Sequence, residues 1–134
     1  MTGKKVLIVD DDTDILDALT MILESYGYGV IVAHDGTECM DRIKTEKPDL
    51  VILDLLMPIM DGFAVYKELK SAEWSEYQNI PIIILTSVRE EASRRRYELE
   101  TGQQLNPDSY LEKPLIPDVL IAKVEKVLKY KLQN

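Results

Sequence analysis

Five short, mostly apolar runs divide this chain at regular intervals, and they constrain its fold more than any other feature. They cover residues 6–9, 30–33, 50–53, 82–85 and 109–111. Apolar runs without polar alternation are typical of strands that are covered on both faces, as in parallel sheets. Between the runs, apolar residues recur at helical spacing, for example at Ile15, Leu19 and Ile22. Strands that alternate with helices in this way predict right-handed crossovers and a parallel sheet.

The helical patterns lie around residues 15–23, 39–43, 63–69, 89–101 and 117–128. With five strands they predict an α/β domain of three layers, built on a doubly wound five-stranded parallel sheet. The expected strand order is 2-1-3-4-5, which is called flavodoxin-like. We expect one domain over residues 4–132, because 134 residues can bury one proper core and no linker interrupts them.

The charge balance argues against several classes of partner. The chain has 24 acidic and 16 basic residues, a net charge of −8, which disfavours direct binding to nucleic acid or to an anionic membrane. The single cysteine, Cys39, excludes an internal disulfide, and its place among apolar helical positions predicts a buried thiol. No apolar run reaches membrane-spanning length and no signal peptide is recognisable, so we expect a cytoplasmic location.

Polar residues stand at the carboxyl ends of four of the predicted strands. Asp10 and Asp11 follow the first strand, Asp54 the third, Thr86 the fourth and Lys113 the fifth. A lone Asp at a strand end is more often a helix cap or a solvated acid. Because the carboxyl ends of parallel strands meet at one edge of the sheet, however, these five side chains should converge on one site.

The residue types indicate the chemistry of this site. Three carboxylates against one ammonium leave two uncompensated negative charges, which favours a bound divalent cation. Oxygen ligands of this kind suit Mg²⁺. Lys113 would then attract an anionic ligand, and Thr86 would donate a hydrogen bond to it. A nucleophilic carboxylate beside a metal ion, a lysine and a hydroxyl suits the acceptance of a phosphoryl group.

Four motifs occur in order over nearly the whole chain: Val9-Asp10-Asp11, Asp54-Leu-Leu-Met-Pro-Ile-Met-Asp-Gly, Leu85-Thr86-Ser87 and Tyr110-Leu-Glu-Lys113-Pro114. Through them the sequence resembles the receiver domains of two-component response regulators, including the chemotaxis regulators. The resemblance implies that Asp54 accepts a phosphoryl group from a histidine kinase or a phosphotransfer protein. It also implies a signalling switch that is not an enzyme beyond its own phosphorylation and slow autodephosphorylation.

The resemblance implies further roles at the site. Mg²⁺ would be bound directly by Asp11, Asp54 and the backbone carbonyl of Leu56, while Asp10 would act mostly through water. Thr86 and Lys113 would hold the phosphoryl oxygens, and the Lys113–Pro114 peptide would be cis.

The resemblance also implies how the signal is passed on. On phosphorylation, Thr86 would move toward the new charge and Tyr110 would turn into the space it leaves, shifting the fourth helix and the fifth strand. On general grounds, an ordinary half-buried strand aromatic is an equal interpretation of Tyr110, and only the resemblance favours the switch.

Two functions outside this family share part of the pattern. An Mg²⁺-dependent aspartyl-nucleophile phosphatase needs a second Asp two residues after the nucleophile, where this chain has Leu56. An FMN-binding flavodoxin needs a phosphate loop after the first strand, where Asp10-Asp11-Asp12 would repel the phosphate.

In receiver domains, the positions of Leu56 and Val88 flank the path of the hydrolytic water. Both are apolar here, which predicts slow autodephosphorylation.

Two segments near the fourth helix need separate interpretation. Residues 103–109 form a longer loop than the family usually has. No output domain is recognisable after the last helix, and the chain either works alone or is a fragment of a longer protein. The signal must then leave through a surface, and we expect this loop to modify binding to a downstream protein or to a second copy. Leu105 is the one apolar side chain it offers, and a tolerated insertion is the equal alternative. In the polar helix before it, Glu90–Arg94 and Glu91–Arg95 are spaced for ion pairs on a solvated face.

Overall fold

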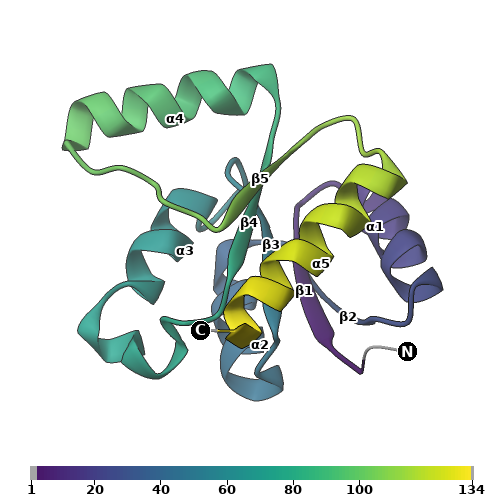
Figure 1. Ribbon diagram of the computed structural model, residues 1–134. Helices are drawn as coiled ribbons and strands as arrows, with labels where there is room; N and C mark the ends of the chain where they lie inside the picture. Colours follow the sequence, from purple (N-terminus) through teal and green to yellow (C-terminus); the bar gives the residue numbers. More distant parts are fainter. Residues whose placement is uncertain (1–2, 134) are drawn as a thin grey trace.

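The computed structural model describes residues 3–133, without the side chains of residues 88, 89 and 131–133. It contains a parallel sheet between two layers of helices (Figure 1). The strands are β1 (Lys5–Val9), β2 (Gly29–Ala33), β3 (Leu50–Asp54), β4 (Ile82–Thr86) and β5 (Ser109–Glu112). Their order is β2-β1-β3-β4-β5, and all neighbours are parallel. The predicted fold class and strand order are therefore confirmed.

Each predicted helix is present, as α1 (Thr13–Ser25), α2 (Gly36–Glu46), α3 (Gly62–Leu69), α4 (Val88–Thr101) and α5 (Pro117–Gln133). An aspartate side chain caps the start of the first three by accepting a backbone N–H bond: Asp12 for α1, Asp35 for α2 and Asp61 for α3. The sequence did not predict the short 3₁₀ helix η1 (Ala72–Tyr77), because six residues are too few to show a helical period.

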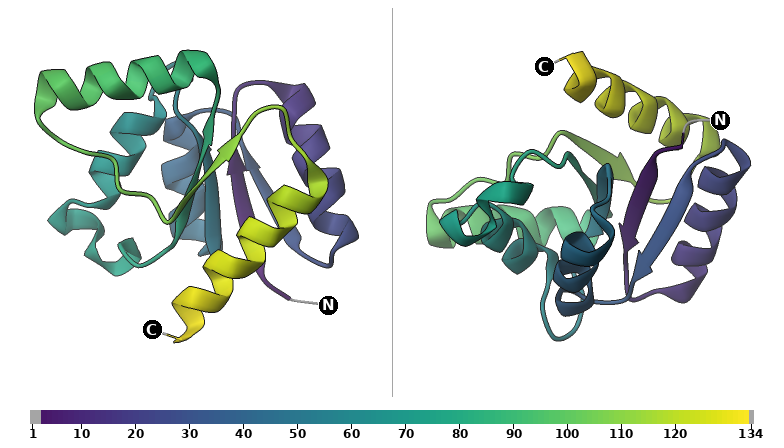
Figure 2. Two further views of the ribbon diagram at one scale, coloured as in Figure 1. Left: turned by 45° about the horizontal axis from the view of Figure 1, so that its top comes forward. Right: turned by 90° about the horizontal axis from the view of Figure 1, so that it is seen from below.

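The strands place alternate side chains on opposite faces, which creates two cores. Val6 and Ile8 of β1 pack with α1 and α5, whereas Leu7 and Val9 pack with α2, α3 and η1. Figure 2 shows α1 and α5 on one side of the sheet and α2 and α3 on the other. The central strand β3 is buried along its whole length, as its apolar run predicts.

The helix α4 differs from the other helices because, among its described side chains, Tyr97 is the one apolar group that packs against the core. Within residues 90–101, whose side chains the structure describes, the one buried residue is Glu90. In Figure 1 this helix lies along the end of the molecule at which the strands terminate, and the loop that follows it returns past α3 to β5.

That loop contributes a side chain to the core. Leu105 is 5% exposed and packs into the same cluster as α2 and α3, so the prediction that it is offered to partners is wrong. Two hydrogen bonds hold the loop in place: Leu105 N donates to Glu98 Oε2 (3.2 Å) and Asn106 N donates to Tyr66 Oη (3.0 Å). The loop thus completes the hydrophobic core that the polar helix α4 leaves open.

Two expectations from composition can be compared with the structure. Cys39 is fully buried, as predicted, and its burial raises the pKa of the thiol to about 12. None of the helices within residues 3–133 is long and apolar enough to cross a membrane.

Candidate functional site

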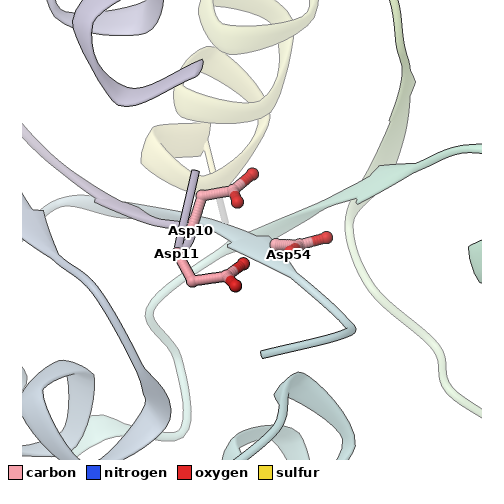
Figure 3. A group of neighbouring side chains, drawn as sticks. All are labelled: Asp10, Asp11 and Asp54. Carbon is pink, nitrogen blue, oxygen red and sulfur yellow. The ribbon is translucent and has the colours of Figure 1, made fainter. Parts of the chain in front are cut away.

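The carboxyl ends of β1 and β3 bring three aspartates together. Val9 is paired with Leu53, so Asp10 follows β1 at the level where Asp54 ends β3. The carboxylate oxygens of Asp10, Asp11 and Asp54 include a set that lies within 4.8 Å of one another. Figure 3 shows the three side chains directing their carboxylates to the same side of the strand ends. The predicted convergence of these three residues is confirmed.

Asp10 and Asp54 are nearly inaccessible to solvent, and Asp11 is exposed. The backbone N–H of Asp12 donates to Asp10 Oδ1 (3.0 Å), which fixes the first of these carboxylates. The other oxygen, Oδ2, is buried without a hydrogen-bond partner among the described residues. Asp12 itself caps α1 and is therefore used structurally.

The turn after Asp54 is held by a close approach between β3 and α3. Gly62 N donates to Leu55 O (2.9 Å), and a Cβ at Gly62 would lie 2.3 Å from the carbonyl oxygen of Asp54. Since that distance is impossible between non-bonded atoms, Gly62 allows α3 to start against the strand end. The sequence Asp61-Gly62 thus supplies both the cap and the space that this turn requires.

Lys113 arrives from the end of β5, where its backbone N–H donates to Thr86 O (2.8 Å). Its Nζ lies 3.5 Å from Asp10 Oδ2, 3.5 Å from Asp54 Oδ1 and 3.2 Å from Glu90 Oε1. The Lys113–Pro114 peptide is cis, as the resemblance implied. Lys113 therefore joins the aspartates as predicted, and it meets a fourth carboxylate that was not predicted.

The fourth carboxylate, Glu90, is 6% exposed and points into the site from the first turn of α4. The predicted pair with Arg94 is wrong: Glu90 faces Lys113, and Arg94 pairs with Glu91 and Glu98. The sequence did contain a signal, since Ser87-x-x-Glu90 is a capping box, in which the Glu side chain turns back toward the helix start. Ser87 caps α4 by accepting from Glu90 N at 3.4 Å.

Burial and charge shift the pKa values of these groups. The pKa of Asp54 is raised to about 8, mainly by burial and further by the adjacent Glu90 carboxyl group and the charge of Asp10, against the charge of Lys113. Burial also raises the pKa of Asp10, against the hydrogen bond from Asp12 and the charge of Lys113. Burial alone would raise the pKa of Glu90, but the neighbouring Asp54 and Ser87 side chains and the charge of Lys113 lower it overall. Asp54 therefore binds a proton more readily than Glu90 does.

The pKa of Lys113 is affected by the same two causes, burial and nearby charge, with the opposite signs. Burial lowers its pKa, but the negative charges of Asp54, Asp10 and Glu90 outweigh burial and raise the pKa above its ordinary value. The lysine is therefore a fixed positive charge among four acidic side chains, counting the exposed Asp11. One cation cannot balance that number of carboxylates, so the site has a strong preference for further positive charge.

These side chains line a cavity of roughly 280 Å³, formed by Asp10, Asp11, Asp12, Asp54, Leu56, Ser87, Glu90 and Lys113. Leu56 is thus at the site, and its side chain is half-buried. Of the described residues, Thr86 and Tyr110 are not part of this lining. Thr86 is buried at the end of β4. The guanidinium carbon of Arg94 lies over the Tyr110 ring, 5.2 Å from the centre of that ring. The side chain of Val88 lies outside the described part of the chain.

The donor set fits a hard divalent cation. Carboxylate oxygens from Asp10, Asp11 and Asp54 converge, and the buried Asp10 Oδ2 has no hydrogen bond among the described residues, with Lys113 Nζ 3.5 Å away. Magnesium and calcium prefer such oxygen ligands, whereas zinc prefers nitrogen and sulfur. Next to this cluster, Lys113 can pair with an anion that approaches Asp54.

Comparisons with known proteins agree with the site. The family model described as "Response regulator receiver domain" matches residues 6–125. Among curated proteins, the chain is 38% identical over 127 residues to the alkaline phosphatase synthesis transcriptional regulatory protein PhoP of Bacillus subtilis, which covers 95% of this chain and 49% of that protein. It is 36% identical over 125 residues to the response regulator MprA of Mycobacterium avium, covering 93% of this chain and 51% of MprA. The chain thus spans about half the length of these relatives.

Solved structures share the fold over the whole chain. A CheY-like receiver domain from Methanospirillum hungatei has a TM-score of 0.78 at 28% identity, covering 98% of both chains. The receiver domain of a signal transduction histidine kinase from Syntrophus aciditrophicus has a TM-score of 0.78 at 32% identity, covering 95% of this chain and 91% of that one. Since the family model and the fold both extend over nearly all of the sequence, this chain belongs to the response regulator receiver domains of two-component systems.

Proposed function

We propose that this protein is a signalling switch that accepts a phosphoryl group on Asp54 and then binds its partners differently. The observation that carries the proposal is the position of Asp54, a buried carboxylate at the tip of the central strand, 3.5 Å from a lysine and beside two further aspartates. We infer that residues 4–132 form the receiver unit that performs this step.

In the proposed reaction, a carboxylate oxygen of Asp54 attacks the phosphorus of the donor. The bond between that phosphorus and the donor's leaving atom breaks, and the leaving group keeps the electron pair. Asp54 must first give up its proton, because only the ionised carboxylate is a nucleophile. Lys113 pairs with the oxygens of the incoming group, and Thr86 donates a hydrogen bond to them after a movement of its strand end.

Asp11, Asp54 and the carbonyl of Leu56 would hold Mg²⁺, with Asp10 acting through water. When bound, the ion supplies positive charge that offsets the negative charge of the phosphoryl oxygens. The donor set described above suits this ion, and the shortage of positive charge in the cavity gives a physical reason for it.

The donor would be a phosphohistidine of a histidine kinase or of a phosphotransfer protein. This proposal is supported by the relatives, which include transcriptional regulators and a receiver domain of a histidine kinase. The chain would be no enzyme toward other substrates, because the position two residues after Asp54 is Leu56, which cannot act as a general acid.

The signal would leave through the surface next to Lys113 and Tyr110. A hollow lies between β5 and the start of α5, and Ile116 and Val119 at its rim are 55% and 41% exposed. Exposed apolar side chains around a concave surface favour contact with another protein. We propose that the phosphorylated chain binds a downstream protein or a second copy there, through the switch residues Thr86 and Tyr110.

The proposal is tested by intact mass after treatment with acetyl phosphate. With Mg²⁺ the protein should gain the mass of one phosphoryl group, and with EDTA it should gain none. Asp54→Asn should abolish the gain, whereas Asp41→Asn, which changes an exposed helical aspartate, should leave it unchanged. A mass gain by the Asp54→Asn variant at the wild-type rate would show that another residue is modified.

A further inference from the structure

Glu90 has contacts that its helix does not require. Its carboxylate is buried, Oε1 lies 3.2 Å from Lys113 Nζ, and Oε2 is buried without a hydrogen-bond partner among the described residues. A buried carboxylate with one unpartnered oxygen is unfavourable, so its position reflects the attraction of Lys113. Release into water would satisfy that oxygen.

Lys113 has three N–H donors, and three carboxylates already surround it: Asp10, Asp54 and Glu90. A phosphoryl group on Asp54 needs the same ammonium for its own oxygens and brings nearly two negative charges. Asp10 and Asp54 are fixed at buried strand ends. Glu90 is the one of the three that belongs to a helix turn, so it is the carboxylate that can leave.

Because of how α4 is attached, movement of Glu90 away from Lys113 would affect only the first turn of this helix. In its second half, Tyr97 stacks on Phe63 with ring centres 4.6 Å apart, and Glu98 holds the Leu105 backbone. In its first turn, the one buried side chain that the structure describes is Glu90. Losing the contact with Lys113 would therefore free the first turn while the second half stays anchored.

We propose that Glu90 is a built-in anion that occupies the phosphoryl-binding side of the cavity, and that phosphorylation of Asp54 expels it and frees the first turn of α4. This inference rests on the proposed function, because it assigns Glu90 a role in the same reaction. It makes Glu90 a positioning residue: it holds Lys113 in the resting state, slows the entry of a phosphoryl donor by its charge and links the chemistry to α4.

The test compares Glu90→Gln, which removes the charge but keeps the shape, with Glu100→Gln, an exposed position on the same helix. Phosphorylation by acetyl phosphate and Mg²⁺ is followed by intact mass. Glu90→Gln should react roughly tenfold faster than the wild type, since one repelling charge is gone, and Glu100→Gln should react at the wild-type rate. Glu90→Asp, whose shorter carboxylate retracts from Lys113, should fall between them and serves if the glutamine variant does not fold.

Hydrogen–deuterium exchange provides a second measurement. If Glu90 had a merely structural role, exchange would not follow the pattern described next. In the wild type, phosphorylation should raise exchange in residues 87–92 and leave residues 95–101 unchanged. In Glu90→Gln, residues 87–92 should exchange quickly before phosphorylation, and phosphorylation should add little.

The outcomes separate the two proposals. If the wild type is phosphorylated on Asp54 but Glu90→Gln is no faster, or the first turn of α4 does not respond, the role of Glu90 is wrong and the proposed function stands. Slower phosphorylation of Glu90→Gln, together with weaker Mg²⁺ binding by titration, would instead make Glu90 a ligand-side residue and overturn the inference. If the wild type gains no phosphoryl mass, the proposed function itself fails.

Discussion

Ile59 has an unusual backbone conformation for its residue type. Its φ is 69°, in the left-handed region, and its side chain is 86% exposed. A β-branched residue is disfavoured there because its branches crowd the backbone, and an exposed side chain recovers little by packing. The flanking bonds, Met60 N to Pro58 O (2.8 Å) and Gly36 N to Met60 O (2.9 Å), hold the turn in this form. The loop after Asp54 is therefore strained at one residue.

Replacing Ile59 by glycine should relieve this strain. We expect Ile59→Gly to raise the free energy of unfolding by about 1 kcal/mol, the relief of the left-handed conformation exceeding the added freedom of the unfolded chain. Urea unfolding followed by circular dichroism measures this change. Ile59→Val keeps the branch and should be neutral, and a glycine variant less stable than wild type would show that the turn is not strained.

Under the proposed function, Leu56 would influence how long a phosphoryl group stays on Asp54. It lines the cavity, and its side chain cannot orient a water molecule for attack. We expect Leu56→Asn to hydrolyse the phosphorylated form roughly tenfold faster, because the amide can position water, and Leu56→Met to behave as wild type. The decay of the phosphorylated mass after removal of the donor gives both rates. A wild-type lifetime of seconds would contradict the predicted slow autodephosphorylation.

At the scale of elements, α4 and the loop after it act as one unit. The described side chains of the helix are mostly polar, and the loop supplies Leu105 to the core beside α3. Helices of globular proteins are usually held by an apolar stripe. Here the packing of the region depends on Leu105 and on the Phe63–Tyr97 stack, which places the stabilising contacts at the far end of α4 from the cavity.

This arrangement predicts a large effect from a residue in a loop. Leu105→Ala should lower the free energy of unfolding by about 2–3 kcal/mol, as for other buried leucines, while Gln104→Ala should change it by less than about 0.5 kcal/mol. Thermal and urea unfolding of the two variants make the comparison. If both variants had the same free energy of unfolding, the loop would be only a tolerated surface insertion.

At the scale of the whole molecule, ionisation of the buried Asp54 lowers the free energy of unfolding. Asp54 has a pKa of about 8 in the folded protein, against its ordinary value of 3.8. Between these values the folded state binds a proton that the unfolded state has lost, so stability decreases as the pH rises through this range. The lowered pKa of Glu90 has the opposite sign, but its contribution changes only below its ordinary value of 4.5. Above pH 5 the site's pH dependence therefore follows Asp54, and the raised pKa of Asp10 acts in the same direction.

In the presence of EDTA, the wild type should lose stability between pH 5.5 and pH 8.5 relative to Asp54→Asn. We expect the difference between the two proteins to change by about 3 kcal/mol over this interval, since one pKa unit corresponds to about 1.4 kcal/mol. Urea unfolding at each pH measures it. Parallel pH profiles of the two proteins would mean that Asp54 is already ionised at pH 5.5.

The sequence by itself determined the layers, the strand order and the convergence of Asp10, Asp11, Asp54 and Lys113. These follow from local periodicity and from the rule that parallel strands end at one edge, and both operate whatever the side-chain details are. The family motifs extended this to the cis peptide at Lys113–Pro114, which composition and spacing do not indicate.

Only the tertiary structure decided the orientation of α4 and the position of its side chains. A helix without an apolar stripe does not specify in its own sequence which face turns inward, so Glu90 was assigned to solvent. Its direction is set by Lys113, which lies far along the chain and reaches it only after the sheet has formed. Leu105 is buried for a related reason: the space it fills exists because α4 leaves it open, and a single apolar residue in a polar loop does not indicate such a space.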